Sequence, residues 1–347
     1  MKKYVNFYII ILVSIGFISC EKLLVKPDPK NTPTECFESL WNRVNEKYPF
    51  LEYKNINWDS IKTVYEPAIH DNMNEVQLFK VLDSMLYTLK DGHVNLYAPF
   101  NLSRNWEWQL GYPENFNFSL LEREYLGTNY YITGPFINQL YSLNNNKKIG
   151  YMYYGSFSGS FSDYHLSFVL NRFKETDGLI IDVRNNGGGI TNNIYKLVNR
   201  FVNEKSLIGK SIEKTGKDHN AFGNEFSYYA EPSYDSEGNK LPQYLNKPII
   251  ILTNRSCYSA CNSFAGFMSI LPNVTLLGDQ TGGGGGLPTS YQLPNGWVYR
   301  MSTTITTLPN GFNIEKGVPV DIHQDMDPAN VALGQDEILE KAFSLFQ

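Results

Sequence analysis

A serine that follows an apolar run is the first candidate for chemistry in this 347-residue chain. Ser259 lies in the polar segment 254–263, directly after the apolar run 248–253. At the opening turn of a helix a serine hydroxyl lies near the positive end of the helix dipole, and the next backbone N–H, here that of Ala260, can face a developing oxyanion. The alternative is a helix N-cap, the commonest use of a serine at such a position.

A second segment, 182–189, is placed in the same way between an apolar run and a helical pattern. It ends in the glycines 187–189, which let the backbone turn tightly and direct N–H groups at an anion near a helix N-terminus. Such a loop can serve as an oxyanion hole. Its alternative is an ordinary turn between a strand and a helix.

A general base drawn from histidine has few candidates, because the chain contains only five histidines. His93 follows Asp91 and Gly92, a turn signal that would expose the imidazole at a domain edge. The alternative is a structural or solvated histidine.

Two further segments carry weaker signals. The glycines 282–286 allow close approach of the backbone and loop motion, and they predict a flexible rim or a substrate-edge loop. Glu315 alone reads as a surface carboxylate.

Hydrophobic periodicity indicates the elements that must position these residues. From residue 148 onward strands alternate with helices, and the runs 179–181 and 249–252 are continuously apolar, as strands buried on both faces are. This pattern predicts an α/β fold in which sites collect at the carboxyl ends of the strands. The expected strands are 149–154, 178–183 and 248–253, and the expected helices are 161–174, 190–202 and one that begins near 258.

The rest of the chain divides into smaller units. Apolar residues at helical spacing predict a small N-terminal helical domain over 34–92. Short runs rich in aromatic residues, Asn and Gly predict a small β-rich insert over 93–147. The α/β core is expected over 148–347, with a polar excursion at 205–246.

The N-terminus reads as an export signal. Two lysines precede an apolar run at 8–18, which is too short for a convincing membrane span and is followed by Ser19 and Cys20. Residues 1–20 resemble a bacterial lipoprotein signal peptide, in which Cys20 would be lipidated and become the new N-terminus. The proline-containing stretch 21–33 would then be a tether to a membrane of the bacterial cell envelope. The alternative is a simple N-terminal anchor helix.

Composition sets limits on function. Hydrophobic residues make up 42% of the chain and charged residues 19%, which is typical of a folded protein. A net charge of −5 without a long basic run excludes the positive surface that nucleic-acid binding needs. Besides Cys20 there are three cysteines, Cys36, Cys257 and Cys261, and this odd number predicts no disulfide framework. They lack the spacing and histidine partners of a zinc site, so we expect buried thiols and no metal.

Five segments, taken in order, resemble those of the C-terminal processing and tricorn-type serine peptidases. They are Asp-Gly-His at 91–93, Asp-x-Arg-x-Asn-x-Gly-Gly at 182–189, Ser-Ala at 259–260, Gly-x-x-Thr-x-Gly at 278–283 and Glu-x-Gly-Val-x-x-Asp at 315–321. The resemblance extends from about Lys90 to the C-terminus. It implies a ClpP/crotonase-like βαβ core, a peptide or protein substrate, and neither a metal nor an organic cofactor.

The resemblance also assigns roles to single residues. It makes Ser259 the nucleophile that attacks the scissile carbonyl, and the N–H groups of Ala260 and Gly188 the oxyanion hole. The processing proteases use a lysine base in a Thr-x-Gly-Lys-Gly turn. The matching position here is Gly284, which excludes a Ser/Lys dyad at that place.

The tricorn-like branch uses a histidine instead, and its position is matched by His93. A glutamate at the position of Glu315 helps to order the site, as a third group does when it holds a base in the correct tautomer. The expected function is that of an exported serine peptidase without a PDZ domain, because the stretch between His93 and the core is too short for one. The rival is a catalytically inactive lipoprotein that binds peptide or lipid on the same fold, since fold does not fix function.

Overall fold

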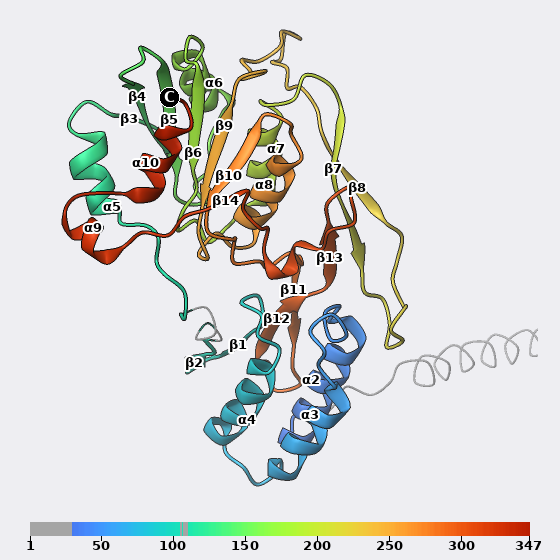
Figure 1. The fold of residues 1–347 in the computed structure, drawn as a ribbon. Coiled ribbons are helices and arrows are strands. Elements are labelled where there is room, and N and C mark those ends of the chain that lie inside the picture. Colours follow the sequence, from blue (N-terminus) through green and yellow to red (C-terminus); the bar gives the residue numbers. More distant parts are fainter. Residues whose placement is uncertain (1–29, 105, 107–109) are drawn as a thin grey trace, which may run out of the picture.

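The structure is a computed structural model that describes residues 30–104, 106 and 110–347 (Figure 1). A seven-stranded sheet forms its centre. In spatial order its strands are β14 (Ile322–His323), β10 (Val274–Gly278), β9 (Ile249–Thr253), β6 (Gly178–Asp182), β5 (Lys148–Tyr154), β4 (Phe136–Ser142) and β3 (Tyr131–Thr133). The strands from β14 to β5 are parallel, and β4 and β3 add an antiparallel edge.

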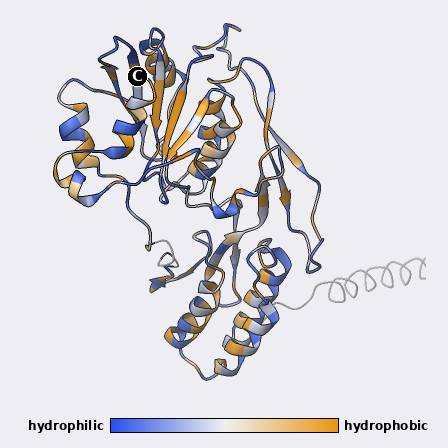
Figure 2. Cartoon of the chain, in the orientation of Figure 1, coloured by the Kyte–Doolittle hydropathy of each residue, from blue (hydrophilic) through white to orange (hydrophobic). Residues whose placement is uncertain are grey.

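Helices cover both faces of this sheet (Figure 1). One face carries α6 (Asp163–Arg172), α7 (Thr191–Val198) and α8 (Ala260–Ser269), and the other carries α5 (Phe118–Leu120), the π-helical turn Leu121–Leu126, α9 (Pro328–Ala332) and α10 (Glu337–Ser344). Successive residues of β9 enter opposite cores, with Ile251 in the first and Leu252 in the second. This double burial accounts for the continuous apolar runs, which Figure 2 shows along the central strands. The predicted α/β fold class is confirmed.

A separate hydrophobic core holds the N-terminal lobe together. It lies between three helices, α2 (Pro33–Lys47), α3 (Trp58–Tyr65) and α4 (Glu75–Tyr87), and an antiparallel sheet ordered β11 (Pro288–Gln292), β12 (Val298–Ser302), β1 (Asn95–Ala98) and β2 (Asn101–Leu102). Leu82 of α4 and Trp297 beside β12 belong to the same buried cluster. The helices therefore do not form a core alone, because strands from the C-terminal part of the chain complete it.

The segment 93–147, expected as one β-rich insert, is divided between two sheets. β1 and β2 belong to the N-terminal lobe, whereas β3 and β4 extend the central sheet. The runs reveal strands, and most of them pair with the next strand along the chain, but β1 also pairs with β12, a partner far along the chain that cannot be read locally. The excursion 205–246 likewise contains two strands that form a third sheet with a later one. They are β7 (Ser206–Glu213), β8 (Phe226–Ala230) and β13 (Thr304–Thr307).

The expected signal peptide 1–20, with Cys20, lies outside the described residues, as does most of the tether 21–33. Over the part of the chain that is described, no helix combines the length and apolarity needed to cross a membrane. The three other cysteines are buried free thiols, as predicted.

Candidate active site

Ser259 stands where the chain leaves β9 and enters α8. Its backbone has φ 55° and ψ −118°, a conformation that a non-glycine residue keeps only when its surroundings hold it there. Ser259 N–H donates to Gly283 O at 2.9 Å, and Ser263 N–H donates to Ser259 O at 2.9 Å. The Ser259 side chain makes no capping hydrogen bond to α8. The N-cap alternative is therefore wrong for this hydroxyl.

His93 brings its imidazole to Ser259 from the other lobe. It lies in the turn between α4 and β1, and its Nε2 is 2.9 Å from Ser259 Oγ. Its ring also packs on Tyr258, with the ring centroids 5.0 Å apart. His93 is at a domain edge, as expected, but it is only 5% exposed because the two lobes close over it. The structure thus joins two side chains that the sequence shows only as separate candidates.

Burial sets the protonation state of His93. Removal from water lowers its pKa from 6.5 to about 4. The Asp91 carboxylate opposes this shift, and the positive charges of Arg300 and Lys54 add to it. The imidazole is therefore neutral at neutral pH, the form in which Nε2 can accept a proton from the Ser259 hydroxyl.

Glu315 is connected to the surroundings of His93 through Lys54. It sits in the 3₁₀ turn Ile314–Lys316, forms an ion pair with Lys54 at 2.8 Å and accepts Gly285 N–H at 2.9 Å. Burial first, and the Asp91 charge second, raise the pKa of Glu315 to about 7 against the opposing effect of Lys54. The surface-carboxylate alternative is wrong. Within the described residues Glu315 makes no hydrogen bond to the imidazole of the site.

The two expected oxyanion donors differ in availability. Ala260 N–H is the first amide of α8, and it has no hydrogen-bond acceptor in the described part of the chain. Gly188 lies against Ser259, since a Cβ built on it would come within 2.8 Å of Ser259 Cβ. Its N–H, however, donates to Asn186 Oδ1 at 3.0 Å. Gly188 would have to leave that bond to face an oxyanion.

The glycine run 282–286 is tightly packed, so the expected close approach of the backbone is confirmed and the expectation of a flexible rim is wrong. Four of its five members are buried. A Cβ built on Gly284 would lie 2.4 Å from Tyr258 Cζ, and one on Gly283 would lie 2.1 Å from Glu315 O. Glycine is required here because neighbouring atoms fill the space of a side chain. At the position matched to the lysine of the processing proteases, the Tyr258 ring occupies that space.

Two cavities reach Ser259. A cleft of about 540 Å³ is bordered by His93, Gly188 and Arg300, and a narrow hollow of about 30 Å³ also opens on Ser259. Apolar side chains dominate the wall of the hollow, namely Ile194, Tyr195, Tyr228, Phe267 and Leu287. The site can therefore hold an extended chain in the cleft with a small side chain in the hollow.

Arg184, from the second motif, has a structural role. Its guanidinium is fully buried and pairs with Asp182 at 2.7 Å and Asp336 at 2.8 Å. Asp336 also caps α10, so the arginine fastens the C-terminal helix to the end of β6.

Three polar residues near His93 carry little or no functional signal in the sequence. Asp91 has only its place in the Asp-Gly-His segment, where it reads as a turn residue. Lys54 lies in the turn between α2 and α3, and Ser302 ends β12. Neither has a local pattern, because only the tertiary fold brings them to the site.

Comparison with known proteins places the chain in a family. The sequence matches Peptidase family S41 over residues 148–324 and the tricorn protease C1 domain over residues 29–87. It is 28% identical over 182 residues to a CtpA-like serine protease of Staphylococcus aureus strain N315. This match covers 51% of the present chain and 34% of that protease. A carboxy-terminal-processing protease of Bartonella bacilliformis is 26% identical over 146 residues, 42% of this chain and 30% of that protein. The chain thus spans only about a third of the length of these relatives.

Solved structures agree with this placement. A candidate peptidase from Parabacteroides merdae ATCC 43184 is 39% identical, with a TM-score of 0.83 over 91% of this chain and 97% of that one. Mature CPAF complexed with lactacystin has a TM-score of 0.66 at 12% identity over 90% of this chain and 98% of that one, a likeness of fold alone. The family match covers just over half of the sequence. From these matches, the chain belongs to peptidase family S41.

Proposed function

We propose that this protein hydrolyses peptide bonds with Ser259 as the nucleophile and His93 as the general base. The observation that carries the proposal is the 2.9 Å contact between His93 Nε2 and Ser259 Oγ. Ser259 Oγ bonds to the scissile carbonyl carbon while His93 takes the hydroxyl proton, and His93 then gives that proton to the leaving amine. Water, deprotonated by the same histidine, releases the acyl group.

The backbone beside Ser259 would stabilise the tetrahedral intermediate. Ala260 N–H supports this role because it is a free donor at the positive end of α8. Gly188 would add a second donor if substrate binding releases its N–H from Asn186. Glu315 would contribute through its ion pair with Lys54 rather than by contact with His93.

The apolar hollow beside Ser259 supports a preference for peptide or protein substrates with a small apolar residue before the cleaved bond. Its volume of about 30 Å³ leaves little room beyond a short side chain. A charged side chain there would lose its hydration without gaining a partner.

A peptide library digested by the purified protein, with products identified by mass spectrometry, tests this function. We expect cleavage after small apolar residues, and a loss of about 10³-fold or more in Ser259→Ala. Ser269→Ala, at the far end of α8, is the matched control and should cleave as the wild type does. Cleavage that persists in Ser259→Ala would contradict the proposal.

We further propose that the mature protein begins at a lipidated Cys20 and is anchored to a membrane of the bacterial cell envelope. The support is the sequence of residues 1–20, a basic start, an apolar run and a small residue before the cysteine.

A further inference from the structure

We propose that Asp91 is the carboxylate that positions His93, through Ser302, and that Lys54 joins Asp91 to Glu315. The inference rests on the proposed roles of His93 and Ser259. It goes beyond them because the family resemblance gives the ordering role to the glutamate alone.

Asp91 is held by hydrogen bonds on both carboxylate oxygens. Its side chain is fully buried. Oδ1 accepts His93 N–H at 2.8 Å and Tyr258 O–H at 3.1 Å. Oδ2 accepts Tyr48 O–H at 3.0 Å and Ser302 O–H at 3.1 Å. Four donors around one buried carboxylate fix its position and favour its ionised form.

Ser302 connects this carboxylate to the imidazole. Its Oγ is 3.1 Å from Asp91 Oδ2 and 3.4 Å from His93 Nδ1. An ionised carboxylate can only accept, so the Ser302 hydroxyl donates to Asp91 and its oxygen accepts His93 Nδ1–H. This order places the proton of the neutral imidazole on Nδ1. Nε2 is then unprotonated where it meets Ser259 Oγ, as a general base must be.

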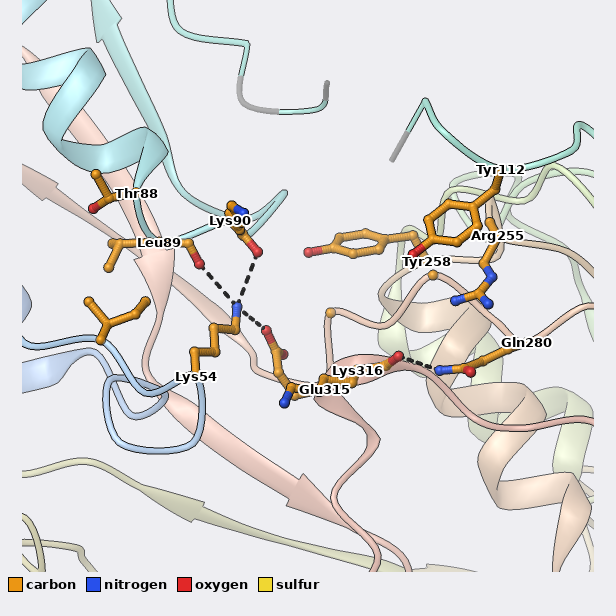
Figure 3. A pocket seen from close by; sticks show the side chains of 13 residues that line it. Lys54, Thr88, Leu89, Lys90, Tyr112, Arg255, Tyr258, Gln280, Glu315 and Lys316 are labelled. Atoms are coloured by element: carbon orange, nitrogen blue, oxygen red, sulfur yellow. Dashed lines mark hydrogen bonds and ion pairs between the residues drawn. The ribbon is translucent and has the colours of Figure 1, made fainter. Parts of the chain in front are cut away.

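Lys54 links Asp91 to Glu315. Its Nζ lies 2.8 Å from Glu315 and 4.0 Å from Asp91 Oδ2, and it donates to the carbonyl oxygens of residues 89–90 at 3.3 Å each (Figure 3). Burial raises the pKa of Asp91, but Lys54 and the hydrogen bonds outweigh it and lower that pKa. Burial dominates at Glu315 and raises its pKa. The negative charge that faces His93 therefore stays on Asp91.

Tyr258 ties the network to the nucleophile. It precedes Ser259 in the chain, and its hydroxyl is one of the donors to Asp91. Its ring also lines a separate pocket of about 620 Å³, and Figure 3 shows it there between Lys54 and Arg255, with its hydroxyl on the side of Lys54. The ring packs against two glycines, because a Cβ built on Gly284 would lie 2.4 Å from Tyr258 Cζ and one built on Gly92 would lie 3.1 Å from the same atom.

The first test measures the rate at which a fluorophosphonate labels Ser259 in the full chain, from about pH 2 to about pH 9, a range that extends below the acid limb. The charged groups that face His93 are Asp91, Lys54 and Arg300. Asp91→Asn should slow labelling at neutral pH by about 10²- to 10⁴-fold, because the imidazolium formed in the reaction loses its counter-charge. The acid limb of its pH profile should move to lower pH for the same reason.

Matched variants separate this role from a general loss of structure. Ser302→Ala should slow labelling by about tenfold, and Glu315→Gln should slow it less than Asp91→Asn does. Asp83→Asn changes a partly buried aspartate of α4 outside the network and should label as the wild type does. A rate for Asp91→Asn equal to that of Asp83→Asn, or higher than that of Glu315→Gln, would overturn the inference.

A second measurement does not depend on catalysis. The imidazole ¹⁵N chemical shifts of His93 distinguish the Nδ1–H tautomer from the Nε2–H tautomer. We expect Nδ1–H in the wild type and a mixture in Ser302→Ala, and an Nε2–H wild type would overturn the inference. A wild type that is never labelled at Ser259 would refute the proposed function, while the tautomer would still decide the role of Asp91.

Discussion

At the scale of single residues, the site combines a strained serine with a buried histidine. The backbone angles of Ser259 lie in a region that costs a non-glycine residue about 1–3 kcal/mol. The contacts of its N–H and C=O hold it there and direct Oγ to His93. Burial keeps that histidine neutral. The position of Ser259 Oγ favours its proposed role as a nucleophile, and the neutral imidazole favours the proposed role of His93 as a base at neutral pH. The backbone strain and the pKa can each be measured separately.

The strain at Ser259 predicts a stability difference between two inactive variants. Ser259→Gly should unfold with a free energy about 1 kcal/mol higher than Ser259→Ala, because glycine adopts a φ of 55° without strain and both variants lack the hydroxyl. Denaturant titration measures the difference. Equal stabilities, or a more stable alanine variant, would mean that the position is not strained.

The buried state of His93 predicts the pH dependence of the site. The imidazole must be unprotonated to act, so the labelling rate of Ser259 should rise with pH through the His93 pKa of about 4 and stay level to neutrality. Arg300 lowers this pKa, so Arg300→Leu should move the acid limb to higher pH. If the labelling rate of the wild type instead rises near the ordinary histidine pKa of about 6.5, the result would contradict the burial of this ring.

Sequence alone identifies Ser259 and His93 as candidates because each lies in a recognisable segment. It cannot show their contact, since they come from different lobes. Glu315 is identified only through the family resemblance, and its link to Lys54 follows from the tertiary fold. Asp91 is read as a turn residue because three of its four donors, Tyr48, Tyr258 and Ser302, are distant in sequence, and the fourth, His93 N–H, makes the local bond of a turn.

At the scale of elements, two strand-to-helix junctions bring the chemistry together. β6 and β9 are adjacent parallel strands, so the segments that follow them meet at one edge of the sheet. Tyr258 N–H donates to Asn186 O at 3.1 Å across this junction. Alternating strand and helix patterns predict this much. The tight packing of the glycine turn cannot be predicted from the sequence, because glycines occur both in mobile loops and where neighbouring atoms leave no space for a side chain.

Crowding at the glycine turn predicts the cost of a single methyl group. Gly284→Ala should destabilise the fold by about 1–3 kcal/mol more than Gly311→Ala. Both glycines have positive φ, 76° and 86°, so alanine strains the backbone at each. Only the Cβ at 284 would meet the Tyr258 ring, whereas the one at 311 meets nothing within 4 Å. Equal losses of stability in thermal unfolding would show that the turn rearranges to accept a side chain, as a flexible rim would.

At the scale of the whole molecule, the site takes residues from both of the lobes that Figure 1 shows, and the contact between His93 and Ser259 joins them. His93, Asp91 and Lys54 come from the N-terminal lobe, and Ser259 and Glu315 come from segments packed on the central sheet. Their contacts join the lobes, so the proposed activity requires both cores to be folded. The domain pattern in the sequence indicates the helices and the α/β core. It does not reveal that strands β11 and β12 complete the N-terminal lobe, because the pairing of β1 with β12 joins segments far apart in the sequence, with Asn95 opposite Arg300.

The proposed lipid anchor predicts where the protein is found in a bacterial host. Cys20→Ser should move it from the membrane fraction to the soluble fraction and abolish incorporation of labelled fatty acid, because the thiol is the proposed attachment point. Cys36→Ala, which changes a buried cysteine of α2, is the control and should remain in the membrane fraction. A wild-type protein without fatty acid would contradict the anchor.

The central claim, a Ser259 activated by His93, is tested most directly by locating a fluorophosphonate adduct. The protein lacking residues 1–20 is treated with the probe and its peptides are analysed by mass spectrometry, together with His93→Ala and, as a control, the exposed His70→Ala. The account predicts an adduct on Ser259 in the wild type and in His70→Ala that is lost in His93→Ala. Absence of any adduct, or equal labelling in His93→Ala, would contradict it and favour a binding protein on this fold.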